Sequence, residues 1–247
     1  MSDTPSPVPA TWVVLDIEGT TSSTASVHTG LYDYARPRLG PWLDEHADDP
    51  DVARAAAEVR RDGHLPDDAP TQDLVDVLHG WMDADVKASP LKTLQGQIWA
   101  AGFAAGELQS HFFPDVPPAL RSWHTSGVRL AVFSSGSVTS QRPWFRHSEH
   151  GDLSALVDQW FDTVNAGPKR EPASYGRIAD ALGTRAGLVF LSDVPAEVAA
   201  ATEAGWTAIG VRRPGEPQEH ADFGAAGVVA SFEEVSVLPV SADRGVS

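Results

Sequence analysis

Cysteine is absent from this chain of 247 residues, and basic residues are few. Without cysteine the protein has no disulfide bond, no zinc–thiolate site and no thiol nucleophile. Its 18 Lys and Arg residues stand against 34 Asp and Glu residues, which gives a formal net charge of −16. Non-specific binding to nucleic acid or to an anionic membrane needs a basic surface, so we expect neither as a partner.

Long apolar runs are absent as well. No stretch of the sequence approaches the roughly 20 apolar residues of a membrane span. The first residues, MSDTPSPVPATW, lack the basic region and the apolar core of a secretion signal. We therefore expect a cytoplasmic protein. Residues 1–10 are rich in Ser and Pro, and we expect them to be disordered.

The stretch Thr11 to Thr21, TWVVLDIEGTT, gives the first indication of a site. A short apolar run closed by turn residues is typical of a buried parallel strand, and open α/β sheets bind ligands at the carboxyl ends of such strands. Asp16 and Glu18 stand at that end. Taken alone, an acidic pair before Gly-Thr is more often a solvated turn than a catalytic site.

Three later apolar runs also end in groups suited to phosphate chemistry. Ser134-Ser135-Gly136-Ser137 offers hydroxyl and backbone N–H groups to an anion. Lys169 stands in a Gly-Pro loop, and Asp193 follows a buried run. Each has a simpler interpretation: the serine turn as a helix N-cap, Lys169 as a solvated loop lysine and Asp193 as the cap of a helix beginning near Ala196. The order of all four stretches along the chain favours a phosphoryl-transfer site.

The pattern of elements predicts an α/β fold, with a Rossmann-like parallel sheet core and an inserted all-helical cap domain. Residues 11–21 and 111–237 alternate strand and helix at the spacing of βαβ units and form the expected core. Residues 22–110 form the expected cap, with helical patterns over 27–45, 51–61, 71–87 and 91–108 and no convincing strand. Residues 238–247 are expected to be a frayed tail.

Hydrolysis of a phosphate ester would use the acidic residues in two ways. Asp16 is placed to be the nucleophile, because a carboxylate can form an acyl phosphate. A divalent cation must bridge two negative groups, and Mg²⁺ prefers few carboxylates and several waters, which fits Asp16, Asp193 and the backbone carbonyl of Glu18. The side chain of Glu18 is then left to act as the acid and base.

The remaining groups are suited to the phosphate itself. The hydroxyl of Ser134, the backbone N–H groups of Ser135 and Gly136, and the ammonium of Lys169 can hold the phosphate oxygens as charge shifts in the transition state.

With these residues the chain resembles the haloacid dehalogenase-like superfamily of phosphatases and, within it, the enolase-phosphatase E1 (acireductone synthase) family. Glu18, in place of the superfamily's usual Asp two residues after the nucleophile, is a specific mark of that family. The resemblance spans about Val13 to Pro214 and rests on the segments DIEGTTSS, SPLKTLQGQIW, GELQSHFFPDVPPAL, FSSGSV, FDTVNAGPKREPASY and VFLSDVPAEVAAATEAG.

The resemblance implies a phosphoric monoester hydrolase that uses one Mg²⁺ per subunit and acts as a monomer on a small phosphorylated molecule. In the implied reaction, 2,3-diketo-5-methylthiopentyl 1-phosphate is enolised and then dephosphorylated through an aspartyl phosphate. The product is the acireductone 1,2-dihydroxy-3-keto-5-methylthiopentene of methionine salvage. The implied roles are nucleophile and metal ligand for Asp16, backbone metal ligand and acid/base for Glu18, phosphate binding for Ser134 and Ser135, contact with phosphate and nucleophile for Lys169, and metal ligand for Asp193.

Several positions depart from the pattern of that family. Thr24-Ala25-Ser26-Val27 replaces an expected Ile-Ser-Phe-Val, so a bulky apolar pair is missing. The run 141–146 is less apolar than expected, and Ala199 replaces an acidic residue. These changes leave a phosphatase for another small phosphorylated metabolite as the alternative. A haloacid dehalogenase, which needs no metal, and a catalytically silent binding module are less well supported, because neither gives all four stretches a purpose.

Overall fold

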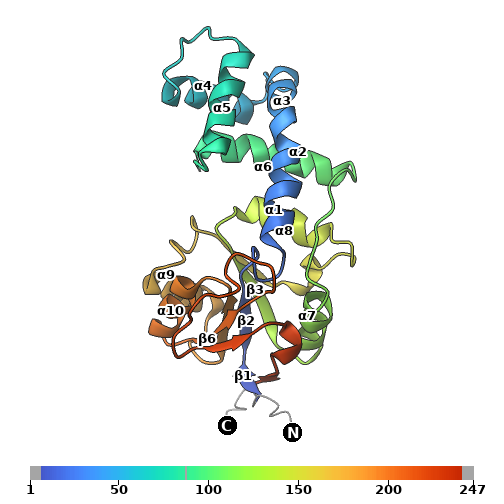
Figure 1. The fold of residues 1–247 in the computed structure, drawn as a ribbon, viewed down its shortest axis with the longest axis vertical. Helices are drawn as coiled ribbons and strands as arrows, with labels where there is room; N and C mark the ends of the chain where they lie inside the picture. Colours follow the sequence, from blue (N-terminus) through green and yellow to red (C-terminus); the bar gives the residue numbers. More distant parts are fainter. Residues whose placement is uncertain (1–6, 87, 241–247) are drawn as a thin grey trace, which may run out of the picture. The chain divides into compact units, whose positions relative to one another are not determined.

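The computed structural model describes residues 7–86 and 88–240, and the chain divides into two compact units (Figure 1). Unit 1 comprises Met1–Thr24 and Ser110–Ser247, and unit 2 comprises Ala25–Gln109. The chain therefore starts unit 1, builds the whole of unit 2 and then returns to complete unit 1. From the sequence we placed these two junctions at residues 22 and 110.

The main sheet of unit 1 has six strands, and every pair of neighbours is parallel. In space the strands follow the order β4-β3-β2-β5-β6-β7. The chain passes from β2 to β3 on one side and later to β5 on the other, so the order reverses beside β2. Sheets of this kind bind ligands outside the carboxyl ends of the strands at such a reversal. The strands are β2 (Trp12–Leu15), β3 (Arg129–Phe133), β4 (Gln159–Phe161), β5 (Leu188–Ser192), β6 (Thr207–Val211) and β7 (Gly227–Val229).

Helices in unit 1 lie mainly in the connections between these strands. They are α7 (Val116–Thr125), α8 (Val138–Arg146), α9 (Pro172–Leu182) and α10 (Pro195–Glu203), with short 3₁₀ turns η3 (Ser154–Leu156) and η4 (Phe232–Glu234). The ends of α9 show how the sequence fixes them. Pro172 stands in the first turn, where its missing N–H has no partner to lose, and Gly183 takes the left-handed conformation that ends the helix, with φ of 71°.

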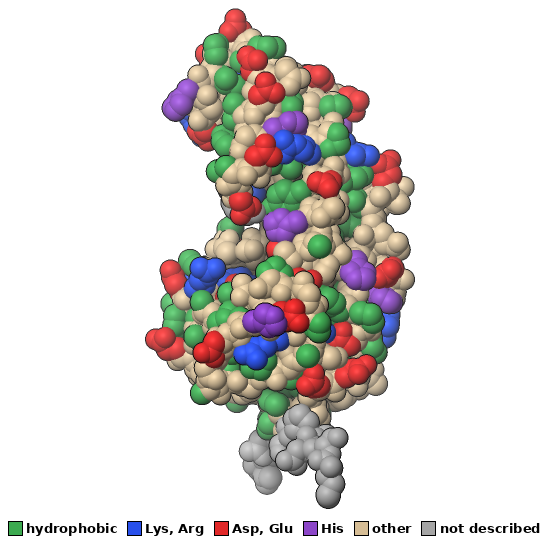
Figure 2. Space-filling view, viewed as in Figure 1, with side chains coloured by type: hydrophobic (Ala, Val, Ile, Leu, Met, Phe, Trp, Pro, Cys, Tyr) green, Lys and Arg blue, Asp and Glu red, His purple; other side chains and the backbone are tan. Residues whose placement is uncertain are grey.

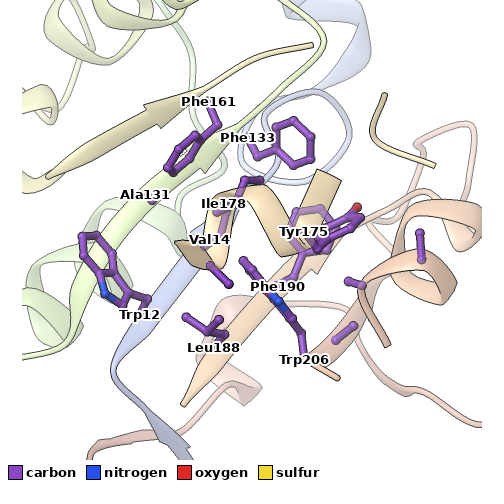
Figure 3. Packing of buried hydrophobic residues seen from close by; sticks show 14 of the residues in the cluster. Trp12, Val14, Ala131, Phe133, Phe161, Tyr175, Ile178, Leu188, Phe190 and Trp206 are labelled. Atoms are coloured by element: carbon purple, nitrogen blue, oxygen red, sulfur yellow. The ribbon is translucent and has the colours of Figure 1, made fainter. Parts of the chain in front are cut away.

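Aromatic rings pack α9 against the sheet (Figure 3). The ring of Tyr175 on α9 lies 5.2 Å from Phe190 of β5 and 5.5 Å from Trp206, at interplanar angles of 70° and 78°. Phe133 of β3 meets Tyr175 at 5.7 Å and 81°. Edge-to-face pairs of this kind are favourable beyond the apolar area they bury. This packing holds together β3 and β5, the two strands that flank β2.

Both ends of the described chain form strands. We expected residues 1–10 to be disordered and 238–247 to be frayed, but β1 (Val8–Ala10) pairs in parallel with β8 (Val237–Pro239). Backbone pairing between distant segments orders residues whose local composition favours no regular structure. Residues 1–6 and 241–247 lie outside the described residues.

Helices are the regular elements among the described residues of unit 2, and turns and irregular segments join them. A nearly continuous helical run links α1 (Thr24–Val27), a π-helical turn η1 (His28–Tyr32), α2 (Asp33–Ala35), a 3₁₀ turn η2 (Arg36–Arg38) and α3 (Leu39–Glu45). It is followed by α4 (Pro50–Asp62), α5 (Thr71–Asp83) and α6 (Ser89–Ala104). Buried leucines at positions 39, 74, 78 and 94 form the centre of its own apolar core.

Two helices of unit 2 are shorter than we predicted. The helix expected over 71–87 ends at Asp83, and Asp85 has a positive φ of 52°, which a right-handed helix does not admit. The helix expected over 91–108 ends at Ala104, ahead of Gly106 with φ of 73°. A residue in the left-handed conformation therefore follows shortly after the end of each helix, and the apolar periodicity of the sequence did not show where the helices end.

The surface agrees with the acidic composition. Figure 2 shows Asp and Glu side chains distributed over both units, with fewer Lys and Arg side chains among them. None of the helices in the described residues is both long enough and apolar enough to cross a membrane.

The aromatic packing gives a prediction for stability. Phe190 is fully buried, so Phe190→Ala should lower the free energy of unfolding by about 3–5 kcal/mol through lost burial and a residual cavity. Urea unfolding followed by circular dichroism measures the change. Leu238→Ala is the control, because Leu238 is 55% exposed and its truncation should change the value by less than about 0.5 kcal/mol. Equal effects of the two substitutions would contradict this description of the core.

Candidate active site

The carboxyl ends of three neighbouring strands bring the predicted residues to one edge of the sheet. Asp16 follows β2, Ser134 follows β3, and Asp193 follows β5. The register pairs Leu15 with Val132 on one side and with Leu191 on the other. Strands in register end at the same level, so side chains more than 170 positions apart in sequence share one edge.

Lys169 makes the closest contact in this cluster. Its Nζ lies 2.6 Å from Oδ1 of Asp16 and 2.7 Å from Oε2 of Glu197. All three side chains are less than a tenth exposed. The structure therefore places Lys169 in a buried ion pair with the proposed nucleophile, and the alternative of a solvated loop lysine is wrong.

The loop that carries Lys169 is held from α9. The hydroxyl of Tyr175 donates to the carbonyl of Lys169 at 2.8 Å, and the hydroxyl of Ser174 donates to the carbonyl of Pro168 at 2.7 Å. Gly167 has a positive φ of 99°, a conformation that favours glycine. The Gly-Pro-Lys order thus makes a turn that aims the lysine into the site.

Glu197 was not predicted from the sequence. It stands in the first turn of α10, four residues after Asp193, and it also accepts a hydrogen bond from Oγ of Ser192 at 2.9 Å. Acidic residues are common in the first turn of a helix because they interact favourably with its dipole. The position of Glu197 in the sequence is therefore common for a glutamate and does not indicate a role in the site. Ala199, which stands where the family pattern has an acidic residue, is exposed on the same helix.

The surroundings of Lys169 favour its charged form. Burial alone would lower its pKa, but the carboxylates of Asp16 and Glu197 raise that pKa above its ordinary value. The ammonium group is therefore charged at neutral pH. It pairs directly with the carboxylate of Asp16, the proposed nucleophile.

Asp193 is in the opposite situation. Burial raises the pKa of Asp193 to about 8, and the negative charges of Asp16 and Glu197 add to the effect. Its backbone N–H donates to Oγ1 of Thr20 at 2.9 Å, and that hydroxyl contacts Oδ1 of Asp193 at 3.4 Å. Three buried carboxyl groups therefore surround one ammonium group, which contacts two of them, and ionisation of all three would leave the site with an excess of negative charge.

Gly19 shows how closely the loop after β2 approaches Asp193. Gly19 has φ of 71°, and a Cβ atom built on it would lie 2.2 Å from Oδ2 of Asp193. No side chain fits in that space. The loop that carries Glu18, which is half-buried, therefore runs directly over the Asp193 carboxylate.

These features fit a hard divalent cation. Its charge would offset the excess of carboxylate, and Asp16, Asp193 and the Glu18 carbonyl are oxygen donors, which such cations prefer. No group of three or more His, Cys, Asp or Glu side chains arranged to hold a metal is found among the described residues. A cation here would have to use backbone and water oxygens besides two carboxylates, which is the pattern typical of Mg²⁺.

The serine turn lies at the same edge. Ser134 is buried and accepts the N–H of Gly136 on its hydroxyl at 3.3 Å, whereas Ser135 and Gly136 are exposed. Ser137 is the N-cap residue of α8 by position, but its side chain makes no cap hydrogen bond. The N–H of Val138 instead donates to Oδ2 of Asp162 at 3.0 Å. Helix capping therefore does not account for the serines.

Gln141 supports this turn and was noted in the sequence only as a departure from a pattern. Its buried Nε2 donates to the carbonyl of Gly136 at 2.7 Å and to that of Phe161 at 2.9 Å. Phe161 also accepts the N–H of Ser134 at 3.2 Å. One side chain thus fastens the serine turn to the end of β4.

The chain was compared with known proteins. The haloacid dehalogenase-like hydrolase family model matches residues 11–205. The enolase-phosphatase E1 of Saccharopolyspora erythraea is 57% identical over 236 residues, which cover 95% of this chain and 98% of the relative. The enolase-phosphatase E1 of Streptomyces avermitilis is 55% identical over 226 residues, covering 91% and 94%.

Solved structures have the same fold. The UTR4 protein of Saccharomyces cerevisiae is 28% identical, with a TM-score of 0.76 over 91% of this chain and 99% of that chain. CbbY of Rhodobacter sphaeroides, solved in complex with phosphate, is 19% identical with a TM-score of 0.55, over 91% of this chain and 96% of that chain. The similarity to CbbY concerns the fold alone.

The raised pKa of Asp193 predicts a pH-dependent stability in chelator-treated protein. Because the folded-state pKa of about 8 lies above the ordinary value of 3.8 for an Asp side chain, protonated Asp193 stabilises the fold at low pH, and this contribution is lost as the pH rises through 8. The melting temperature of the wild type should therefore fall relative to that of Asp193→Asn between about pH 4 and 8. A constant difference between the two proteins over that range would contradict the prediction.

Glu197 yields a second prediction. Glu197→Gln should lower kcat/KM about 10–100-fold, because Lys169 loses one of the two groups that hold it. The melting temperature of chelator-treated protein should not fall, since the substitution removes one of the excess carboxylates while Lys169 keeps Asp16. Glu203→Gln, at an exposed position of the same helix, is the matched control. A loss of stability without a loss of activity would show that Glu197 has only a structural role.

Proposed function

The chain belongs to the haloacid dehalogenase-like hydrolases and, within them, to the enolase-phosphatases E1, and from this membership we propose its reaction in detail. It converts 2,3-diketo-5-methylthiopentyl 1-phosphate into the acireductone 1,2-dihydroxy-3-keto-5-methylthiopentene in methionine salvage. The observation that carries the phosphatase half is the buried contact of 2.6 Å between Lys169 and Asp16, which pairs an ammonium group with a carboxylate at the carboxyl end of β2.

Asp16 acts as the nucleophile. One of its carboxylate oxygens forms a bond to phosphorus while the bond from phosphorus to the ester oxygen breaks, and Glu18 gives its proton to that leaving oxygen. Glu18 then takes a proton from a water molecule that attacks the aspartyl phosphate. Inorganic phosphate leaves, and Asp16 is restored as a carboxylate.

The phosphate oxygens are held by groups that lie at the same edge. Ser134 contributes its hydroxyl, Ser135 and Gly136 contribute backbone N–H groups, and Lys169 contributes its ammonium group. Gln141 fixes the carbonyl of Gly136 and so limits the orientations open to this turn. Donors held in place before the reaction stabilise the transition state without having to reorganise.

We assign one Mg²⁺ per subunit to Asp16, Asp193 and the backbone carbonyl of Glu18. When bound, the cation would supply positive charge that offsets the negative charges of the phosphate and the attacking carboxylate. The support for this site is the excess of buried carboxylates and the close approach of the loop at Gly19 to Asp193.

Enolisation needs a base beside the carbon that lies next to a carbonyl group, and we assign this role to Glu18. It removes the proton from that carbon before it serves as the acid of the phosphatase step. Glu18→Gln should therefore lose enolisation as well as phosphate release. Full enolisation by this variant, followed by absorbance in a single turnover, would assign the base elsewhere.

We propose that unit 2 acts as a cap that excludes water and macromolecules from the reaction. Its support is its position in the sequence, because it begins at Ala25, directly after the loop that carries Asp16 and Glu18. A small phosphorylated molecule is then the substrate. We further propose that the protein works as a monomer in the cytoplasm.

A second candidate substrate is another small phosphorylated metabolite. The observation that favours it is Thr24-Ala25-Ser26 at the start of unit 2, where the family pattern has bulky apolar residues. Smaller side chains at these positions would suit a substrate of another shape and leave Asp16, Lys169 and Asp193 as they are.

The decisive measurement mixes purified protein with the diketo phosphate and Mg²⁺ and follows acireductone absorbance and phosphate release together. Both signals should appear, both should require Mg²⁺, and Asp16→Asn should abolish phosphate release. If phosphate is released only from other metabolites, the roles of Asp16, Lys169 and Asp193 stand, but the proposed substrate is wrong.

A further inference from the structure

Arg213 is a buried charge that the proposed reaction does not use. It follows β6 by two residues and is 3% exposed. Its guanidinium carbon lies 4.4 Å from the ring centre of Phe113 and 4.8 Å from that of Phe232. A charge held between two rings and out of water requires partners of its own, since an unpaired buried charge is strongly destabilising.

Arg213 donates to three neighbours. Nη1 donates to Oδ2 of Asp115 at 2.7 Å, which ties the end of β6 to the start of α7, and to the carbonyl of Ala230 at 3.3 Å. Nε donates to the backbone carbonyl of Thr20 at 3.0 Å, which ties it to the loop after β2. The ion pair with Asp115 supplies the opposite charge, and Nη2 is buried without a hydrogen-bond partner among the described residues. The bond to Thr20 is the one that reaches the loop after β2.

Thr20 continues the connection into the active site. Its side chain is fully buried, and its Oγ1 accepts the backbone N–H of Asp193 at 2.9 Å. Arg213, Thr20 and Asp193 thus form a path of two hydrogen bonds that ends at a proposed metal ligand. The loop cannot adjust freely along this path, because Gly19 already leaves no space for a Cβ beside the Asp193 carboxylate.

We propose that Arg213 is a positioning residue for the active site. Through Thr20 it keeps the loop that carries Glu18 in register with Asp193, and it thereby sets how tightly the site binds its divalent cation. This inference rests on the proposed function. A purely structural role for Arg213 would affect the stability of the protein and leave its affinity for the cation unchanged.

Arg213→Lys tests the proposal, because lysine keeps the positive charge but has one nitrogen to serve all three neighbours. The affinity for Mg²⁺ is measured without substrate, from the rise in melting temperature as Mg²⁺ is added to chelator-treated protein. The dissociation constant should rise about 10-fold or more, the size of effect found when the partner of a metal ligand is removed. At saturating Mg²⁺, kcat should fall by more than KM changes.

Asp115→Asn is the matched control. It removes the charge partner of Arg213 and leaves the bond between Nε and Thr20 in place. This variant should lower the melting temperature and leave the dissociation constant for Mg²⁺ within about 2-fold of the wild type, a difference that amounts to roughly 0.4 kcal/mol. An equal loss of Mg²⁺ affinity in the two variants would overturn the proposal.

A double-mutant cycle tests the path itself. Thr20→Val removes the hydroxyl that joins the loop to Asp193, so its effect on Mg²⁺ affinity should not add to that of Arg213→Lys. Thr20→Ser should restore the wild-type value. Additive effects of the two substitutions would show that Arg213 does not act through Thr20.

A variant that fails to fold and a wrong substrate have different consequences. If Arg213→Lys does not fold, the double variant Arg213→Gln with Asp115→Asn, which removes both charges together, takes its place in the same titration. If the wild type forms no acireductone, the proposed substrate fails, whereas the titration with Mg²⁺ still decides the role of Arg213.

Discussion

The ammonium group of Lys169 is shared between two buried carboxylates, those of Asp16 and Glu197, and a third carboxylate, Asp193, lies close enough to feel their charge. The parallel sheet creates this concentration of charge, because it ends neighbouring strands at one level and covers their sides with helices. One ammonium group would not balance three ionised carboxylates in a buried site. A phosphate group would add further negative charge, which is why the proposed reaction includes a divalent cation.

Local signals in the sequence were sufficient for most of the fold of unit 1. Pro172 and Gly183 mark the two ends of α9, and the apolar run that ends in Asp16 marks the central strand. Signals failed where a distant partner decides the structure. Val8 lies in a Ser/Pro-rich segment that has no local reason to form a strand, and it does so because Val237 pairs with it. The ends of α5 and α6 were misplaced for a related reason, because backbone conformations at Asp85 and Gly106 interrupt patterns that look helical by composition.

The candidate site divides in the same way. Asp16, Lys169 and Asp193 each end an apolar run or stand in a distinctive turn, so the sequence identified them, and the fold brings them together at one edge. Glu197 and Arg213 stand among residues that look ordinary along the chain: one is an acidic residue in a first helical turn, and the other lies in a run of two arginines. Their importance comes entirely from what they contact. Residues that support a site from behind contact groups far away in sequence, and periodicity and spacing do not report on such contacts.

The pairing of β1 with β8 has a consequence for how the chain can be connected. Val8 and Val237 are register partners on adjacent parallel strands, so the first and last described elements are held side by side. Because these strands run in the same direction, a linker that joined the end of β8 to the start of β1 would have to travel back along their length, which a short flexible segment can do. The order of the elements could then be permuted by opening the chain at one of the two junctions between the units. Unit 2 would become a terminal domain, and the six-stranded sheet would for the first time be formed from a single uninterrupted stretch of chain.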